Sequence, residues 1–209
     1  MILDDSDNRL PEFQPRESSG VTTHYRRLDE RMVLGAKRNL SHTFCTGDII
    51  VYMDDDDYYP PERVSHALEC LQGNDSLIAG STLSPIHFVQ QHQTWIAGPC
   101  GKYHATASTF AFRRELPESR VYQDEAGFAE ESLFLAKFRL FMAQLDSAKT
   151  ILCIAHEANT FDKSKLIRGG KNSRMRPLGR GNSAKLPAIS NARMQQYIEA
   201  FTRRRAAPC

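Results

Sequence analysis

Four consecutive aspartates, Asp54 to Asp57, constrain the fold more than any other feature of the sequence, because they directly follow the apolar run Ile49–Met53. A continuous β-branched run of this kind is typical of a strand covered on both faces, as in a parallel sheet. Four adjacent carboxylates repel one another at neutral pH, so a compact fold requires water or a cation to offset the repulsion. Since ligands bind at the carboxyl ends of strands in open parallel sheets, the run favours a metal–diphosphate site over a solvated acidic turn.

Short apolar runs alternate with helical patterns along most of the chain, and this alternation predicts an α/β sheet protein. Residues 11–23 are rich in Pro, Ser and Gly and are expected to form a loop. Pro60 and Pro61 predict the start of a helix, and Gly73 predicts its end. Strands are expected at residues 2–3, 49–53, 77–80, 107–113 and 150–155, and helices at 28–44, 60–73 and 128–138.

Composition narrows the class of protein. The 209 residues are 41% hydrophobic and 25% charged, which is usual for a globular protein large enough to bury a core. No apolar run reaches the roughly 18 residues of a membrane span, and the N-terminus lacks the basic and apolar regions of a secretory signal. The five cysteines form no CxxC pair, which argues against a zinc site or a disulfide framework. We therefore expect a cytoplasmic protein.

Charge divides the chain into two parts. Residues 1–162 carry a net charge of −9 and residues 163–209 carry +11, which together give the +2 of the whole chain. The stretch 163–190 is also rich in Gly, Ser, Asn and Pro, as expected of a loose connector. We expect a catalytic domain over residues 1–167 and a basic tail over 168–209.

The tail ends in a predicted amphipathic helix at residues 191–205, with three arginines, Arg203 to Arg205, at its end. We expect its apolar face to pack on the acidic body, with a membrane surface or another domain as the alternative partner. No interleaving of aromatic and basic residues favours nucleic acid. The apolar face comprises Met194, Tyr197, Ile198 and Phe201.

Three further groups could carry chemistry, and each also has an ordinary structural interpretation. Lys37 and Arg38 suit phosphate oxygens, or form a solvated helix face. Glu130 and Glu131 suit a general base, or an acidic helix N-terminus. His156 directly follows a predicted strand and suits a metal ligand or acid–base group, or a structural histidine.

The segment 98–109 is rich in Gly and hydroxyl side chains and enters a predicted strand. It could line a sugar pocket or form an ordinary turn. The pocket residues expected from it are His104, Ser108 and Thr109.

Taken in order, these motifs resemble the GT-A glycosyltransferases of the family 2 type, in particular the small GT-A domains of large DNA viruses and algae. The likeness rests on Gly-x-Lys-Arg-Asn at 35–39 and on Gly-Asp-Ile-Ile-Val-Tyr-Met-Asp-Asp-Asp-Asp-Tyr-Tyr-Pro-Pro-Glu-Arg at 47–63, which includes the family's Asp-x-Asp motif. It covers residues 2 to about 167. The resemblance implies a Rossmann-like GT-A sandwich with a mostly parallel central sheet.

The resemblance also implies residue roles. Asp54 and Asp56 match the two acids of Asp-x-Asp, with Asp56 as the direct ligand of Mn²⁺ or Mg²⁺. Glu131 aligns with the acid of the family's Glu-Asp pair that acts as base, and Glu130 is its rival. The nucleotide-binding residues implied are Asp4, Lys37, Arg38, Asp54 and Asp55, and the metal-binding residues implied are Asp56, Asp57 and His156.

One departure from the family pattern concerns the N-terminus. Family members begin with a strand and a turn that hold the nucleotide, and Met1 falls inside what would be the second strand. We therefore expect the first strand and the first helix to be absent, so that the nucleotide loses contacts that the family provides and the sheet edge loses its neighbouring strand.

The function expected from these residues is metal-dependent, inverting transfer of a sugar from a nucleotide sugar, UDP-linked in the simplest case, to a glycan or other hydroxyl acceptor. This is a hexosyl- or deoxyhexosyltransferase activity. There are two alternatives. One is a nucleotidyltransferase, a class of enzyme that also combines an acidic cluster with a bound nucleotide. The other is a non-catalytic remnant of a glycosyltransferase.

Overall fold

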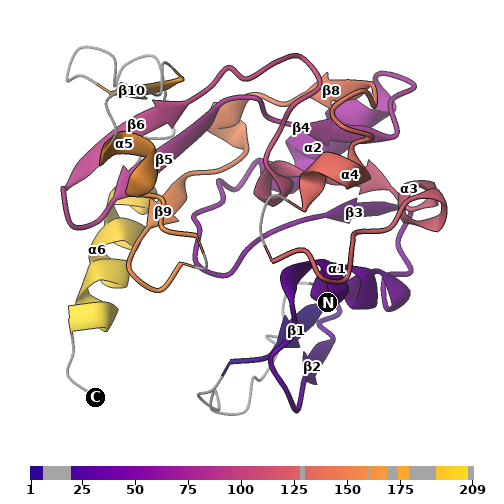
Figure 1. The fold of residues 1–209 in the computed structure, drawn as a ribbon, viewed down its shortest axis with the longest axis horizontal. Helices are drawn as coiled ribbons and strands as arrows, with labels where there is room; N and C mark the ends of the chain where they lie inside the picture. Colours follow the sequence, from indigo (N-terminus) through magenta and orange to yellow (C-terminus); the bar gives the residue numbers. More distant parts are fainter. Residues whose placement is uncertain (7–19, 128–129, 160, 169–173, 179–191, 207–209) are drawn as a thin grey trace.

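The computed structural model describes residues 1–6, 20–127, 130–159, 161–168, 174–178 and 192–206. Two four-stranded sheets lie side by side, and a two-stranded ladder lies apart from them (Figure 1). The first sheet has the order β3 (Ile49–Val51), β7 (Ala111–Arg113), β4 (Ile78–Gly80) and β8 (Met142–Gln144). The second has the order β10 (Met175–Pro177), β6 (Gln93–Ala97), β5 (Ser84–Phe88) and β9 (Cys153–Ala155). The ladder consists of β1 (Ile2–Asp4) and β2 (Tyr25–Arg27).

Both sheets are mixed. In the first, β7 runs antiparallel to β3 and to β4, whereas β4 and β8 are parallel. In the second, β5 and β6 form an antiparallel hairpin, β10 adds antiparallel to β6, and β9 runs parallel to β5. The predicted α/β class is confirmed.

The strand β3 is covered on both faces, as its continuous apolar sequence predicts. Ile50 and the following Tyr52 belong to a core rich in aromatic residues, together with Phe110 and Phe112. Ile49 and Val51 point the other way and pack against the second core, which contains the apolar face of α2 (Arg63–Gln72). The alternation of side chains along a strand thus gives β3 one core on each side.

The predicted helices form, with shifted bounds. The helix α1 (Leu34–Thr43) starts later than the periodicity from residue 28 indicates, and α2 follows Pro60-Pro61 and ends before Gly73, as predicted. The remaining helical segments are η2 (Ala107–Thr109), α3 (Glu115–Ser119), α4 (Glu131–Phe134), η3 (Ser147–Lys149), α5 (Lys165–Arg168) and α6 (Ala192–Ala206).

Two predicted elements are shorter than expected. Of the helix predicted at 128–138, residues 128–129 lie outside the described residues, and α4 ends at Phe134 because Ala136, Lys137 and Phe138 adopt left-handed backbone angles of φ 51, 56 and 60°. The strand predicted at 107–113 starts only at Ala111, since residues 107–109 form the 3-10 turn η2.

The described parts of the basic tail pack on the body. The strand β10 pairs with β6, and Met194 on α6 is fully buried beside Leu152 and Ile154. This confirms the expected packing of the apolar face of the C-terminal helix, which lies beneath β9 in Figure 1. Much of the predicted connector lies outside the described residues, as do the side chains of Arg203 to Arg205. The boundary at residue 167 stays a prediction.

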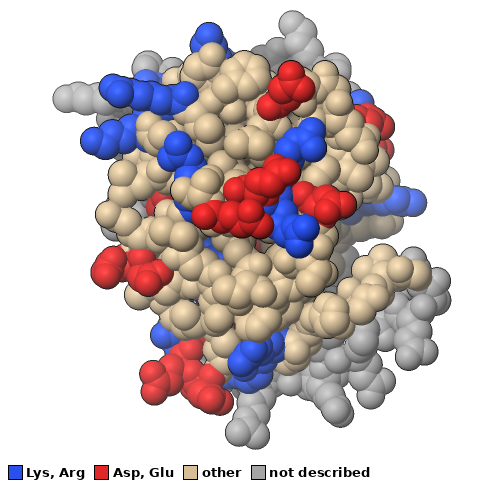
Figure 2. Space-filling view, turned by 90° about the vertical axis from the view of Figure 1, so that its right-hand side faces the viewer, with Lys and Arg blue, Asp and Glu red and all other residues tan. Residues whose placement is uncertain are grey.

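Surface charge is mixed on the face shown in Figure 2, where acidic and basic side chains lie next to one another. Among the helices of the described chain, none combines the length and the apolar character that crossing a membrane requires. The four cysteines in the described residues are free, and Cys209 lies outside them.

Substitution of Gly35 by Ala should destabilise the domain. Gly35 N–H donates to the carbonyl of Ala126, and a Cβ at Gly35 would lie 1.9 Å from the carbonyl oxygen of Gln123. Because that oxygen belongs to backbone, the chain must shift, at a cost of about 1–3 kcal/mol. For a domain of this size we expect Tm to fall by about 2–10 °C in differential scanning calorimetry.

The matched control is Gly101→Ala, since nothing lies within 4 Å of a Cβ at Gly101. A similar Tm for the two variants would contradict the close approach of α1 to the segment 123–126.

Candidate active site

The acidic segment Asp54–Asp57 crosses from one sheet to the other. It follows the carboxyl end of β3, and the next residue, Tyr58, forms an isolated antiparallel bridge with Leu152, just before β9. The Tyr58 N–H donates to the Leu152 carbonyl at 3.0 Å, and the Leu152 N–H donates back at 2.8 Å. The four carboxylates therefore lie at the seam between the two sheets, the kind of sheet edge where α/β proteins place ligands.

The buried member of the run is Asp57. Its side chain is turned into the protein, where Oδ1 accepts a hydrogen bond from the N–H of Ile154 at 2.8 Å and lies 3.9 Å from Lys163 Nζ. Burial, with the negative charges of Asp56 and Asp54 adding to it, raises the pKa of Asp57 to about 7. The Asp57 carboxylate thus holds the backbone of β9, and the metal-binding role expected for it stays a prediction.

Asp56 is half-buried and held from the loop that follows β9. Its Oδ2 accepts from Asn159 Nδ2 at 2.9 Å and lies 3.1 Å from His156 Nε2. Burial by itself would raise the pKa of Asp56, but the hydrogen bond from His156 and the charge of Lys163 lower it below its ordinary value. The carboxylate is thus kept ionised and oriented.

His156 contacts three partners through its two ring nitrogens. Its Nδ1 accepts from the N–H of Ala158 at 3.2 Å, and its Nε2 lies 3.1 Å from Asp56 Oδ2 and 2.9 Å from Asn159 Nδ2. This geometry favours an orienting role over the direct metal ligation that the sequence predicts for His156. The role of Asn159 was not predicted; its position three residues after His156 was the available signal.

Asp54 contacts a different set of residues from Asp56. Its backbone N–H donates to Tyr59 Oη at 2.8 Å, and its carboxylate lies 3.8 Å from Arg38 Nη2. Burial raises the pKa of Asp54, and the positive charge of the nearby Arg38 partly offsets this increase. Asp55 is exposed.

Arg38 connects α1 to both acidic groups. Its Nε donates to Glu130 Oε1 at 2.8 Å, and its guanidinium lies 4.5 Å from the ring centroid of Tyr52. The Arg38 side chain is 11% exposed and that of Glu130 is 5% exposed, so this ion pair is screened little by water. The predicted proximity of Arg38 to the acidic run is therefore present, with Glu130 as its main partner.

Glu131 is the less constrained acid of the pair. It begins α4, and burial, with the charge of Glu130 adding to it, raises its pKa above the ordinary value. A carboxylate with a raised pKa is a better proton acceptor near neutral pH than an ordinary one. Glu130 is engaged by Arg38, so the geometry favours Glu131 as the candidate base.

The other predicted nucleotide-binding residues lie around β1. Asp4 Oδ2 accepts from Tyr25 Oη at 2.6 Å and lies 3.1 Å from Arg27 Nη1, while Lys37 pairs with Asp5. Burial would raise the pKa of Asp4, but its hydrogen bonds lower it far below the ordinary range. These ion pairs join β1, β2 and α1 to one another rather than to the acidic segment.

The predicted pocket residues have different positions. Thr109 is fully buried, and its hydroxyl donates to the Thr106 carbonyl and accepts from the Ser81 N–H, so it supports the backbone, and its pocket role stays a prediction. The ring of His104 stacks on Phe138, with 4.6 Å between centroids. Ser108 is linked to the acidic segment through Tyr59. The Ser108 carbonyl accepts from Tyr59 Oη at 3.3 Å, and the same hydroxyl accepts from the Asp54 N–H.

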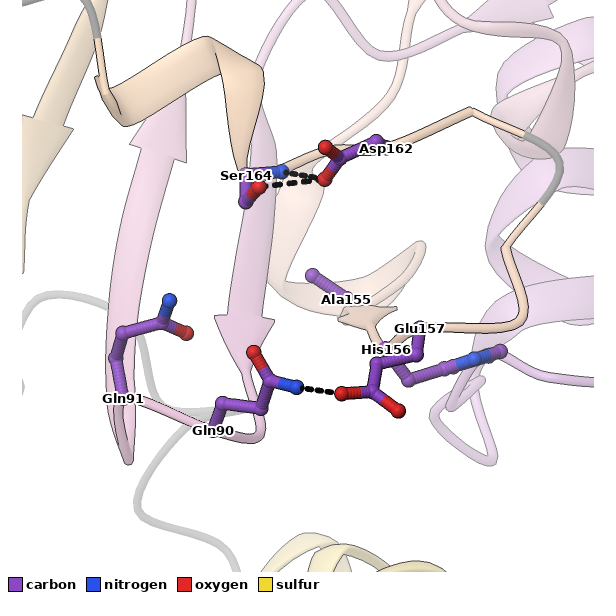
Figure 3. Close-up of a pocket in the computed structure, with 7 residues that line it drawn as sticks. All are labelled: Gln90, Gln91, Ala155, His156, Glu157, Asp162 and Ser164. Atoms are coloured by element: carbon purple, nitrogen blue, oxygen red, sulfur yellow. Dashed lines mark hydrogen bonds between the residues drawn. The ribbon is translucent and has the colours of Figure 1, made fainter.

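A hollow of about 320 Å³ lies beside His156, between the β5–β6 turn and the loop after β9 (Figure 3). The imidazole points out of this hollow, toward Asp56, and Gln90 Nε2 donates to Glu157 across its floor. Six of its seven lining residues have polar side chains; the seven are Gln90, Gln91, Ala155, His156, Glu157, Asp162 and Ser164.

The donor set limits the kind of metal site. Within the described ranges, no three His, Cys, Asp or Glu side chains are gathered where they could ligate one ion. Mg²⁺ sites commonly use only one or two carboxylates, with substrate phosphates and water completing the shell. Asp54 and Asp56 supply two carboxylates for a site of that type, one beside Arg38 and the other oriented by Asn159.

Comparison with known proteins identifies the family. Residues 2–141 match the family model described as glycosyl transferase family 2. The chain belongs to this family. None of the curated protein sequences compared with the chain matches it.

Among solved structures, the chain is similar to S. aureus TarS 1-349 in complex with UDP-GlcNAc. The TM-score is 0.50 at 17% sequence identity, and the match covers 66% of this chain and 43% of that chain. The chain therefore spans less than half of the TarS structure that it matches. At this identity the likeness shows the common GT-A-type fold.

Replacing Arg38 by Met should leave the buried Glu130 carboxylate without its cation. Removing one partner of a buried ion pair typically costs about 3–5 kcal/mol, and we expect a loss of this size in the free energy of unfolding. The double variant Arg38→Met/Glu130→Gln should recover more than half of the loss, because the more buried of the two carboxylates paired with Arg38 no longer carries a charge. Urea unfolding at neutral pH measures both. Equal stabilities for the single and the double variant would contradict this coupling.

Proposed function

We propose that the chain transfers a sugar from a nucleotide sugar, UDP-linked in the simplest case, to a hydroxyl group of an acceptor, with inversion at the anomeric carbon. The observation that carries the proposal is the link that Arg38 makes between Asp54, at the carboxyl end of β3, and the acid pair Glu130-Glu131, within a family 2 domain. The proposal takes Asp54 as a metal-binding acid and Glu131, the neighbour of the Glu130 that pairs with Arg38, as the base.

Donor binding in this proposal centres on Asp54 and Asp56. They would hold Mn²⁺ or Mg²⁺ together with the diphosphate of the donor, and the ion would stabilise the charge of the departing diphosphate. Asp55, Lys37 and Asp4 are proposed to contact the nucleotide. A nucleotide-sugar donor is supported by the UDP-GlcNAc present in the TarS structure.

The chemical step assigned to Glu131 is removal of a proton. Glu131 accepts the proton of the acceptor hydroxyl as its oxygen forms a bond to the anomeric carbon. The bond from that carbon to the diphosphate oxygen breaks on the opposite face, which releases the nucleoside diphosphate and inverts the configuration. Glu130 stays paired with Arg38 and raises the pKa of Glu131 through its negative charge.

The acceptor is proposed to be a glycan or another compound rich in hydroxyl groups. The hollow beside His156 supports this choice, because amide and carboxylate side chains provide the donors and acceptors that sugar hydroxyls require. His104 and Ser108 are proposed to line the pocket that binds the sugar.

Two alternatives make different predictions for the same titration. A nucleotidyltransferase would prefer a nucleoside triphosphate to UDP or a UDP-sugar, and a non-catalytic remnant would bind neither. Calorimetric titration of UDP, UDP-GlcNAc and UTP in the presence of Mn²⁺ separates the three functions.

Asp56→Ala should abolish the Mn²⁺-dependent part of UDP binding, because it removes the oriented carboxylate at the seam. The control is Asp48→Ala, which removes a carboxylate that is 98% exposed just before β3. We expect this control to bind like the wild type in isothermal titration calorimetry. Wild-type Mn²⁺-dependent affinity in Asp56→Ala would show that the metal is held elsewhere.

Glu131→Gln should retain donor binding and lose transfer by about 10²–10⁴-fold, the usual contribution of a general base. In the wild type, the raised pKa of Glu131 should make kcat/KM fall on the acidic side at a higher pH than an ordinary glutamate would, since the protonated acid cannot accept a proton. Product formation is followed by mass spectrometry over a range of pH. A comparable loss confined to Glu130→Gln would assign the base to Glu130.

A further inference from the structure

We propose that the C-terminal helix α6 is part of the active site, in which Tyr197 and Phe201 act as positioning residues for the Asp56 carboxylate. The proposal rests on the function proposed above, in which Asp56 holds the metal ion. It adds to that function two residues from a segment that follows the family-matched region 2–141 in the sequence.

The first contact is between Tyr197 and the acidic segment itself. Tyr197 Oη donates to the backbone carbonyl of Asp57 at 3.1 Å, across a sequence separation of 140 residues. The side chain of Asp57 is held on its other side by the N–H of Ile154. The Asp57 residue is therefore fixed from both α6 and β9, and its neighbour Asp56 is fixed with it.

The second contact reaches Asp56 through His156. The ring of Phe201 lies against the His156 imidazole, with 5.1 Å between centroids. His156 Nε2 lies 3.1 Å from Asp56 Oδ2. Phe201 thus limits the rotation of the ring that contacts the Asp56 carboxylate, as groups beyond the direct ligands commonly do in metal sites.

The helix itself is firmly seated. Met194 is fully buried against Tyr58, Leu152 and Ile154, and the Tyr58 and Tyr197 rings lie 5.5 Å apart. Tyr58 and Leu152 are the two residues that join the sheets beside the acidic segment. One face of α6 therefore covers both the joint between the sheets and the two contacts that hold Asp56.

These contacts exceed what packing alone requires. A phenylalanine at 197 would bury the same ring, whereas the tyrosine hydroxyl also donates to a carbonyl in the acidic segment. A hydrogen bond of this kind typically contributes a factor of about 3–10 to an equilibrium. The structure thus predicts that loss of these contacts from α6 lowers the affinity for the metal and the donor, even when the aspartates themselves are unchanged.

The test compares three single substitutions in the full chain. Tyr197→Phe removes the hydroxyl on Asp57, and Phe201→Leu removes the ring on His156. Thr202→Ala is the matched control, because its hydroxyl donates only to the carbonyl of Ile198 within α6 in the hydrogen bonds described. Two quantities are measured: Mn²⁺-dependent UDP affinity by calorimetry, and backbone hydrogen exchange of the metal-free protein at residues 54–58 and 153–156.

We expect Tyr197→Phe and Phe201→Leu to weaken Mn²⁺-dependent UDP binding about 3–10-fold and to speed exchange in those two segments, with Thr202→Ala like the wild type. Unchanged affinity and exchange in both variants would overturn the proposal. So would faster exchange spread evenly over the domain, because that result indicates general destabilisation. If the wild type binds no UDP with Mn²⁺, the proposed function is wrong, and the exchange data alone decide whether α6 holds the acidic segment.

Discussion

The bridge between Tyr58 and Leu152 is the interaction on which the rest of the site depends. Its two backbone hydrogen bonds join the end of the acidic segment to the second sheet, directly before β9. Without this joint, four adjacent carboxylates would follow β3 into solvent, where their mutual repulsion favours an extended chain. With it, the segment is held at both ends, and its charges face groups that the fold supplies.

The four aspartates are chemically identical but occupy four different environments. Asp55 faces solvent, and Asp54 lies near the Arg38 cation. Asp56 accepts a hydrogen bond from the loop after β9, whereas Asp57 is buried and accepts a hydrogen bond from a backbone N–H. Burial disfavours the charged form most at Asp57, whose pKa rises to about 7, while hydrogen bonding favours it at Asp56. The run therefore divides into one structural acid and two acids suited to a cation.

Charge also explains why the end of the chain returns to its acidic body. Residues 163–209 carry +11 against −9 for the preceding part, and Lys163, the first basic residue of that segment, lies 3.9 Å from Asp57. The apolar stripe of α6 then adds burial at Met194 to this attraction. The tail thereby reaches the same few residues that the family motif places at the end of β3.

Local patterns in the sequence determined the elements whose causes are local. Pro60-Pro61 and Gly73 delimited α2, the apolar run 49–53 gave a strand with a core on each face, and the spacing of Met194, Tyr197, Ile198 and Phe201 gave an amphipathic helix. The motif order also placed Arg38 near the acidic run. Only the tertiary structure decided that Asp57 turns inward, that Arg38 pairs with Glu130, that His156 contacts Asp56, and that Tyr197 contacts the acidic segment. Each of these contacts joins residues 92–140 positions apart. Such contacts depend on which element packs on which, and the spacing of residues along one strand or helix carries no record of that.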